Sequence, residues 1–370
     1  AMGAAVASSP AGGDLYGALD RWLNRIPAGL AISNLGACSI FAALSGSSPA
    51  TCAAIGKMGI PEMRKRGYPD GLATGSIAAG GTLGILIPPS VTMIVYGIST
   101  GTSIGRLFIA GVIPGLMLTL MFIAWSVFYA SSNSSGMTRG SRTYNLREKL
   151  ELAPRVLPFL LLIGGILYVL YGGVATPSEA AGVGAMMCFV LIAVIYKVWQ
   201  PKKIWGILKS STRESVMVMM IIGAAAIFSY TLSSLFITQS IAEWIAALEV
   251  NRWILLGAIN VFLLIAGFFL PPVAVIVMTA PILLPLITQA GFDPYWFAVI
   301  LTINMEIGLI TPPVGLNLYV INGIAPDVGL PKILAGALPF VFIMILGIFL
   351  LCVFPEIVTW LPDLLMGRGT

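Results

Sequence analysis

Two double-proline elements contain the residues of this sequence best suited to binding an ion. They are GILIPPS at 84–90 and GLITPPV at 308–314, each within a long apolar stretch. A proline nitrogen cannot donate the helical hydrogen bond, so each element frees upstream carbonyl oxygens. We predict that these oxygens and nearby hydroxyl groups form a cage for a small hard cation such as sodium. The half-helix N-terminus after each break can face an anion. A plain proline kink is the alternative for either element alone, and the matched pair favours the cage.

A catalytic site is not expected. GISTG at 97–101 matches the G-x-S-x-G nucleophile pattern, but that chemistry requires a histidine base and the chain has no histidine. The four cysteines, Cys38, Cys52, Cys188 and Cys352, lie in apolar stretches without a metal-binding spacing. We interpret them as small buried residues. The sequence thus predicts a protein that is not an enzyme and that carries no cofactor besides bound ions.

Composition places these elements in a membrane. Apolar residues make up 58% of the chain and charged residues 9%, whereas soluble domains carry about 25% charged residues. A membrane-spanning helix needs about 20 mostly apolar residues. Stretches that reach this length include 106–130, 154–172, 178–196, 214–236 and 330–355. A soluble protein is therefore excluded, and the net charge of +5 reports orientation in the membrane and not nucleic-acid binding.

The basic residues predict the topology. Lys and Arg gather in cytoplasmic loops, and here they cluster at 57–66, 139–155 and 197–213. With these segments inside, together with Arg21, Arg25 and Lys332, only Arg106, Arg252 and Arg368 remain outside. The broken apolar stretches 28–56 and 253–290 then begin and end on the same side, and each is predicted to be a re-entrant hairpin. One hairpin opens inward and the other outward.

The sequence also repeats itself. IAGVIPG at 109–115 is echoed by LAGALPF at 334–340, with nearly the same offset as the double-proline elements. A hairpin precedes each double-proline element, and an amphipathic arm (14–26 and 240–250) precedes each hairpin. An odd number of crossings separates the two units, which inverts one relative to the other. Inverted repeats with paired interrupted helices are typical of secondary transporters.

At these residues the chain resembles the large (M) membrane subunit of the tripartite ATP-independent periplasmic (TRAP) transporters. The segments that carry the resemblance are SGSSPAT at 45–51, GGTLGILIPPS at 80–90, GVATPSEAAGVGA at 173–185 and NMEIGLITPPVGLN at 304–317. The resemblance implies an elevator-type carrier of the ion-transporter superfamily that is driven by sodium. It also implies two protein partners, a small membrane subunit (Q) and a periplasmic substrate-binding protein (P). Organic acids, including C4-dicarboxylates, are the substrates that it implies.

The resemblance also assigns site residues. One sodium is expected at Ser45, Ser47, Ser48, Gly84, Ile87 and Ser90, and a second at Gly267, Gly308, Thr311 and Val314. Glycine, isoleucine and valine would contribute backbone carbonyls, whereas serine and threonine could add hydroxyls. The substrate is expected between the hairpin tips, near Ser48, Pro49, Pro89, Pro271 and Pro313.

Several polar residues in apolar stretches carry alternative interpretations. Glu306 could neutralise sodium, or it could accept hydrogen bonds at the end of a broken helix, which we favour. Glu179 follows a proline turn and is expected at a helix N-terminus near the outer interface. Asn304, Asn317 and Asn322 could contact the solute, but hydrogen bonding between helices is the commoner role.

The predicted fold is all-α and polytopic, with two inverted repeats that each carry a re-entrant helical hairpin and a broken transmembrane helix. Repeat 1 covers 1–130, with a broken helix at 71–99, and its opening AMGAAVASSP is interpreted as the end of a truncated helix. A cytoplasmic linker and central helices at 154–196 fill 131–213. Repeat 2 covers 214–355, with a broken helix at 293–324, and a tail covers 356–370.

The predicted function is sodium-coupled import of a carboxylate, handed over by a periplasmic protein, across the bacterial inner membrane. A stand-alone sodium-coupled dicarboxylate or anion carrier is the alternative within the same superfamily. An intramembrane enzyme and an ion channel are alternatives from other classes. Covalent turnover would identify the enzyme, and conductance above carrier rates would identify the channel.

Overall fold

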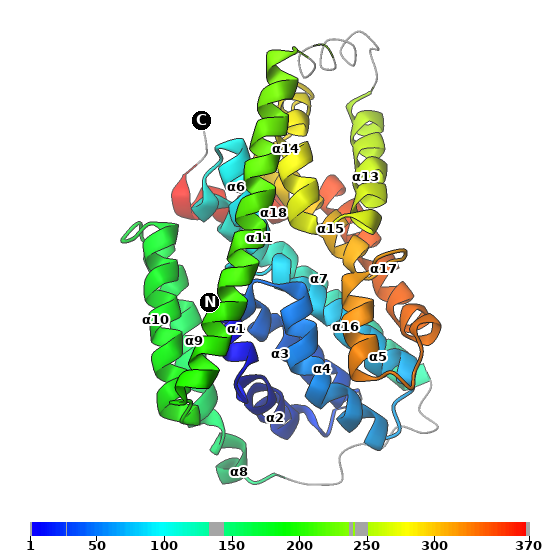
Figure 1. Ribbon diagram of the computed structural model, residues 1–370. Coiled ribbons are helices and arrows are strands. Elements are labelled where there is room, and N and C mark those ends of the chain that lie inside the picture. Colours follow the sequence, from blue (N-terminus) through cyan, green and yellow to red (C-terminus); the bar gives the residue numbers. More distant parts are fainter. Residues whose placement is uncertain (1, 27, 133–143, 237–239, 241–250, 368–370) are drawn as a thin grey trace.

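The computed structural model describes residues 2–26, 28–132, 144–236, 240 and 251–367 (Figure 1). Every regular element in these ranges is a helix, which confirms the predicted all-α fold. The predicted arm at 240–250, except for residue 240, and positions 133–143 of the predicted linker lie outside the described residues.

The first half of the chain forms an arm, a hairpin, a broken helix and a long helix. The arm helix α2 is preceded by a short helix, the hairpin is α3 and α4, and the broken helix is α5, η1 and α6. The bounds are α1 Met2–Ala7, α2 Ala11–Leu23, α3 Gly29–Ser45, α4 Ser48–Lys65, α5 Asp70–Thr82, η1 Leu83–Ile85, α6 Val91–Thr100 and α7 Ile104–Ser132.

Helices α9 and α10 and the first part of α11 separate this half from the second, and the second half repeats the order of the first. Its hairpin is α13 and α14, its broken helix is α15 and α16, and its long helix is α17. The bounds are α8 Leu146–Leu150, α9 Ala153–Tyr171, α10 Pro177–Tyr196, α11 Pro201–Ser234, α13 Arg252–Phe269, α14 Pro272–Gln289, α15 Pro294–Leu309, α16 Leu316–Ile324, α17 Leu330–Val353 and α18 Glu356–Met366.

Proline explains both interruptions. In the first broken helix the chain leaves helical geometry between η1 and α6, where Pro88 and Pro89 lie. In the second it does so between α15 and α16, at Pro312 and Pro313. Because these residues have no N–H to donate, the helix cannot continue through them. The helix resumes only at Val91 and Leu316, so each break is several residues long.

The two halves are interlocked and do not lie merely side by side. The returning hairpin helix α4 packs against α16, the second part of the other half's broken helix, and α14 packs against α6 in the mirrored way. The long helices are exchanged as well, because α17 packs along α5 and α7 packs along α15. Gly336 on α17 meets the backbone of Gly71 and Gly75, which lets α5 and α17 approach closely. Each contact from the first half to the second is thus matched by an equivalent contact from the second half to the first.

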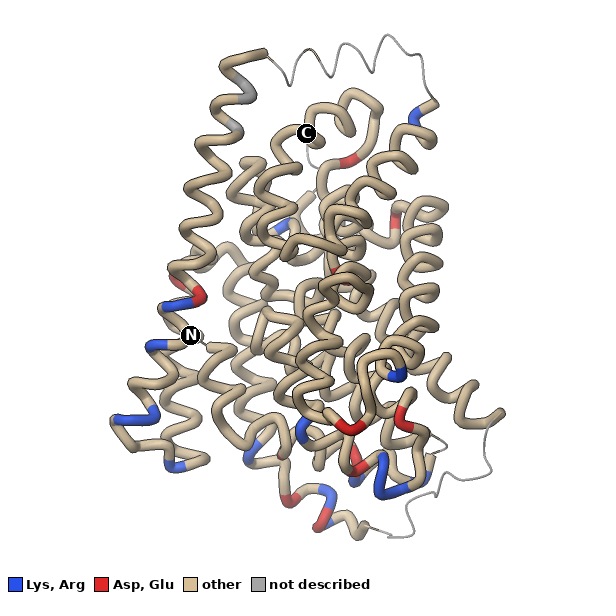
Figure 2. The backbone as a smooth tube through the Cα atoms, turned by 45° about the vertical axis from the view of Figure 1, so that its right-hand side comes forward, with Lys and Arg blue, Asp and Glu red and all other residues tan. Residues whose placement is uncertain are grey.

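Seven helices among the described residues are long and apolar enough to cross a membrane, namely α7, α9, α10, the 201–228 part of α11, α13, α14 and α17. Figure 2 shows most of the Lys and Arg residues toward one end of the molecule, where acidic residues also gather. This distribution agrees with the predicted cytoplasmic clustering of basic residues.

The arm helix α2 contacts both the hairpin and the central helices. Near its C-terminal end, Arg66, the C-cap residue of α4, donates from both terminal nitrogens to the carboxylate of Asp20, over 3.1 and 3.2 Å. Near its N-terminal end, Asp14 accepts a hydrogen bond of 3.0 Å from the Tyr196 hydroxyl of α10. The arm thus joins the returning helix of the first hairpin to the central helices.

Candidate ion- and substrate-binding site

The tip of the first hairpin lies against the first double-proline element. α3 ends at Ser45, and Gly46 reverses the chain with φ of 61°, a left-handed conformation that glycine adopts without strain. A methyl group on Gly46 would lie 2.9 Å from the carbonyl oxygen of Pro89. The tip is therefore in direct backbone contact with the break.

The hydroxyl groups of this tip form a local network. The Ser45 and Thr51 hydroxyl oxygens are 2.7 Å apart, and the Thr51 hydroxyl donates to the Ser47 carbonyl over 2.9 Å. Ser48 is fully buried and donates to the carbonyl of Thr82, the last residue of α5, over 3.1 Å. A donated proton leaves the oxygen lone pairs of each hydroxyl available to a cation. Thr51 and Thr82 were not predicted as site residues, although Thr51 belongs to the SGSSPAT segment.

Backbone contact between the tip and the broken helix occurs at Gly84. A methyl group there would lie 2.8 Å from the Ser47 carbonyl oxygen, closer than real Cβ atoms approach another atom, and 3.0 Å from the Ser48 nitrogen. Ser90 caps α6, because its hydroxyl accepts from the Met93 N–H over 3.2 Å and donates to the Ile85 carbonyl. The structure thus groups Ser47, Ser48 and Gly84.

Ile87 contributes differently from the other predicted residues. Its side chain packs against Gly115 of α7, where a methyl group would lie 2.9 Å from Ile87 Cγ1. The Ile87 N–H is bonded to the Leu83 carbonyl over 2.9 Å. Its main-chain carbonyl is therefore the group that could serve the predicted ion.

The second half reproduces this backbone contact. A methyl group on Gly308 would lie 2.4 Å from the Gly267 carbonyl oxygen and 3.1 Å from the Gly267 Cα. The Val314 N–H also donates to the carbonyl of Phe268 over 3.1 Å, which joins the second break to its hairpin. The Thr311 hydroxyl donates to the Ile307 carbonyl of its own helix. The structure thus brings Gly267, Gly308 and Val314 together.

The predicted substrate residues lie in pairs within each half. Pro49, in the first turn of α4, and Pro89 belong to the first tip and break and are partly buried. Pro271, the N-cap of α14, and Pro313 belong to the second tip and break and are exposed. The segments 45–51, 83–91, 267–273 and 308–316 contain no Lys or Arg. An anion here could be recognised by backbone N–H groups, hydroxyls and helix N-termini.

The remaining polar residues separate into three kinds. Asn304 and Asn317 join helices, because the Asn304 amide donates to Asn260 of α13 over 2.6 Å and the Asn317 amide donates to the Ala78 carbonyl of α5 over 3.1 Å. Glu179 accepts from the Thr176 N–H over 2.8 Å in a capping box at the start of α10, as its predicted position suggested. Glu306 is fully buried, and no described residue hydrogen-bonds to its carboxylate.

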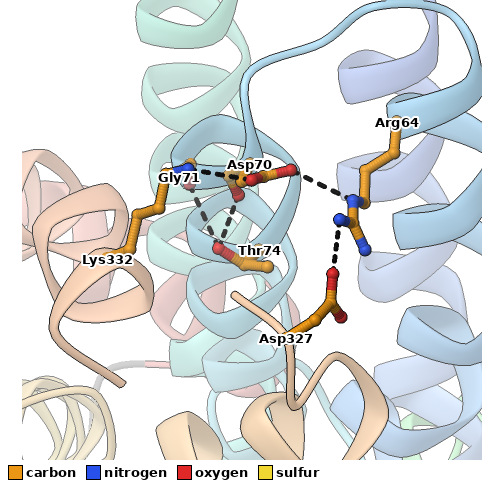
Figure 3. A network of polar contacts seen from close by, with 6 residues as sticks. All are labelled: Arg64, Asp70, Gly71, Thr74, Asp327 and Lys332. Atoms are coloured by element: carbon orange, nitrogen blue, oxygen red, sulfur yellow. Dashed lines mark hydrogen bonds and ion pairs between the residues drawn. The ribbon is translucent and has the colours of Figure 1, made fainter. Parts of the chain in front are cut away.

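A charge network fixes the end of the first hairpin opposite its tip (Figure 3). Arg64 of α4 contacts Asp70 at the start of α5 over 3.0 Å and Asp327, before α17, over 2.6 Å. Lys332 of α17 contacts the other Asp70 oxygen over 2.9 Å. The Arg64 guanidinium lowers the pKa of Asp327 below its usual range, chiefly through their hydrogen bond. This network again joins the two halves.

Comparison with known proteins relates this arrangement to a family. A family model described as the DctM component of the tripartite ATP-independent periplasmic transporter matches residues 1–357. The chain is 41% identical over 343 residues to the C4-dicarboxylate TRAP transporter large permease protein DctM of Pseudomonas aeruginosa, covering 92% of this chain and 79% of that protein. It is 35% identical over 347 residues to the ectoine TRAP transporter large permease protein TeaC of Halomonas elongata, covering 93% and 79%.

A third relative, the sialic acid TRAP transporter large permease protein SiaM of Vibrio cholerae, is 31% identical over 337 residues, covering 91% of this chain and 78% of that protein. Among solved structures, the Alcanivorax borkumensis YdaH transporter superposes with a TM-score of 0.65 at 16% identity, covering 97% of this chain and 86% of that one. At that identity the likeness concerns the fold alone.

Proposed function

Because this chain belongs to the DctM family of tripartite ATP-independent periplasmic transporter components, we propose that it imports an organic acid together with sodium ions. Its relatives are large permease proteins, and the chain is accordingly a multi-pass protein of the bacterial inner membrane.

The mirrored backbone contacts carry the sodium proposal. Gly84 meets the first hairpin at Ser47, and Gly308 meets the second hairpin at Gly267. Both contacts lie beside a double-proline break that frees carbonyl oxygens. Carbonyl and hydroxyl oxygens can replace the hydration shell of an alkali cation, and discontinuous helices hold coupling ions in other secondary transporters. Bound sodium would stabilise each hairpin tip against its break.

A carboxylate is the class of solute that the site suits. The relatives are named for C4-dicarboxylates, ectoine, sialic acid and isethionate, all small polar compounds with an acidic group. Helices α4, α6, α14 and α16 all begin at the tips and breaks, and each N-terminus carries about half a positive charge. Sodium adds further positive charge, so the ion creates part of the anion site.

The packing suggests how the solute crosses the membrane. The exchanged contacts bind the two hairpins and the two broken helices into one body, and the arm helix α2 connects this body to α10. We propose that the body moves as a unit against a scaffold and exposes the site alternately to the two sides. A small membrane subunit completes the transporter, and a periplasmic binding protein delivers the solute.

Vesicles reconstituted with the chain and both partner proteins test the proposal. Succinate is a suitable C4-dicarboxylate probe, and the binding protein supplied must bind it. We expect uptake only with an inward sodium gradient. Ser48→Ala and Thr311→Ala should raise the sodium concentration for half-maximal uptake, whereas Thr288→Ala should not, because Thr288 bonds only within α14.

Each outcome separates one part of the proposal. Uptake that does not depend on the sodium gradient would refute sodium coupling. Unchanged sodium dependence in both Ser48→Ala and Thr311→Ala would refute the assigned ion sites but leave the family membership intact. Uptake of equal rate without the binding protein would favour the stand-alone carrier.

A further inference from the structure

The first half of α11 carries basic residues that no carboxylate balances. Figure 2 shows basic residues along the lower half of the long helix at the left edge of the molecule, which is α11. Several other basic residues at this end pair with acidic ones, as Arg66 does with Asp20. By contrast, the exposed basic residues where α10 meets α11 form no ion pair with any described residue: Lys197, Lys202, Lys203, Lys209 and Arg213.

One face of α11 changes along the helix from basic and aromatic to hydroxyl-bearing to apolar. Trp205, Lys209 and Thr212 follow one another at spacings of four and three residues, and Val216 and Met219 continue the same face. Trp205, Val216 and Met219 are 52–69% exposed, so the described residues leave this face uncovered. From Trp205 to Met219 the helix rises by about 21 Å, which is about half of the 40–45 Å thickness of a bilayer with its headgroups. Since basic residues gather on the cytoplasmic side, the face spans the inner leaflet.

A groove with a volume of about 540 Å³ runs along this face. Hydroxyl-bearing residues, Ser211, Thr212 and Ser215, line the part nearer the basic residues, and Val216 and Met219 line the part beyond. Ser211 is only 7% exposed, and its hydroxyl has no hydrogen-bond partner among the described residues. A buried hydroxyl without a partner is costly. The groove therefore suits a molecule with polar atoms at the level of Ser211 and an apolar part beyond it.

A phospholipid of the inner leaflet presents its groups in the same order. Its phosphate lies outermost, its ester oxygens follow, and its acyl chains lie deepest. Lys209 and Arg213 are one turn apart and thus neighbours on the helix surface, which allows both to reach one phosphate. Glu214, the acidic residue of α11, lies five positions after Lys209 and therefore about 140° around the helix from it. It does not neutralise this face, so an anionic lipid is favoured.

A transmembrane helix of a partner protein is the other kind of occupant that could cover an open helix face. The basic residues on this face all carry the same charge. A partner helix would therefore have to bring carboxylates to the membrane level of Lys209 and Arg213, which is costly. Lipid phosphates lie at the membrane surface already, and long basic side chains reach toward it. The observations thus favour the lipid.

We propose that this face of α11 is a binding site for an anionic phospholipid of the inner leaflet. The phosphate lies between Lys209 and Arg213, and the Ser211 hydroxyl donates to an ester oxygen. One acyl chain lies along Val216 and Met219. The site is separate from the proposed ion and solute sites, and binding requires neither sodium nor solute.

Native mass spectrometry of the purified protein, titrated with dioleoyl phosphatidylglycerol or dioleoyl phosphatidylcholine, tests the proposal. The two probes share their acyl chains and differ in net charge, so the parent should bind phosphatidylglycerol more tightly. The double variant Lys209→Gln, Arg213→Gln should lose about 25-fold in affinity for phosphatidylglycerol, since each basic residue near an anionic lipid surface contributes about fivefold. Its affinity for phosphatidylcholine should not change.

The matched control is the double variant Arg25→Gln, Lys57→Gln. Both residues are exposed, and neither forms an ion pair with a described residue. They also belong to the basic residues of the predicted cytoplasmic side, so the control changes the net charge there by the same amount. It should bind phosphatidylglycerol as the parent does, and a loss equal to that of the α11 variant would refute a site on α11.

Three other outcomes decide against the proposal. Equal affinity of the parent for the two lipids would exclude a preference for anionic lipid. Glycerol 3-phosphate that binds as tightly as phosphatidylglycerol would show a site for soluble phosphate. An α11 variant that keeps its affinity for phosphatidylglycerol but no longer purifies with the small membrane subunit would show that this face docks a protein.

A measurement on the parent alone decides the matter if the α11 variant does not fold. Phosphatidylglycerol with a photoreactive group in its acyl chain should label the segment 216–220 of α11. An excess of unmodified phosphatidylglycerol should prevent this labelling, and the same excess of phosphatidylcholine should not. Labelling confined to other helices would refute the assigned groove.

Discussion

Replacing Gly308 by alanine should weaken sodium coupling selectively. The added methyl group would lie 2.4 Å from the Gly267 carbonyl oxygen and 2.6 Å from its carbon. Both are backbone atoms, so no side chain can rotate away, and the hairpin must withdraw by about 1 Å to reach ordinary contact. The withdrawal separates the two segments that are proposed to share the second sodium.

The size of the effect follows from the cost of overpacking, which is typically about 1–3 kcal/mol. If this cost falls on the ion-bound, closed arrangement, sodium affinity drops by about 5- to 140-fold, since about 1.4 kcal/mol corresponds to tenfold. Gly84→Ala should lie at the lower end, because its methyl group would meet Ser47 at the longer distance of 2.8 Å.

The assay compares these variants with Gly323→Ala. Gly323 belongs to the same broken helix, but a methyl group there meets nothing within 4 Å. The sodium concentration for half-maximal uptake, and the rise in melting temperature as sodium is added, are measured for all three. A Gly308→Ala protein whose two values match those of Gly323→Ala would refute the close-contact reasoning.

Three further predictions concern stability. Asp20→Asn removes the charged acceptor of two Arg66 hydrogen bonds and should lower the free energy of unfolding by about 1–3 kcal/mol, measured by denaturation in detergent; Lys65→Gln should have little effect because Lys65 is exposed. Arg64→Gln should lower the melting temperature at neutral pH. Because Arg64 lowers the folded-state pKa of Asp327, this stabilisation is lost as Asp327 protonates, and the difference in melting temperature should shrink as the pH falls below about 4. A difference in melting temperature that persists in acid would contradict this. Trp296→Phe loses the 2.8 Å bond to the Leu351 carbonyl and should cost about 1 kcal/mol, and an unchanged melting temperature would show that the bond contributes nothing.

The sequence predicted the elements of the fold well, because proline and glycine act locally. The double prolines interrupt α-helices wherever they occur, and their repetition at one offset indicated two equivalent units. The first hairpin turns at Gly46, where glycine adopts the left-handed conformation without strain. The elements were predictable because each depends on residues within a few positions of itself.

The exchanged packing and the partners of single side chains were not predictable in this way. Ile87 lies in an unwound segment, where helical periodicity does not define which way a side chain points, and it packs on α7. Thr82 accepts from Ser48 through its carbonyl, a contact between residues 34 positions apart. Glu306 could be recognised as a buried acid, but the absence of a described donor depends on helices that are distant in sequence.

The exchanged packing has a consequence for how the protein is made. Helices α4 and α5 are synthesised before α16 and α17, the helices that cover them. Before α16 and α17 are made, the Ala78 carbonyl lacks the hydrogen bond from Asn317, and Gly71 and Gly75 lack the backbone of α17 that packs against them. During this interval, the side of α4 and α5 that α16 and α17 later cover must be covered by lipid or by the insertion machinery. The packing of α5 is complete only after α17 has been synthesised.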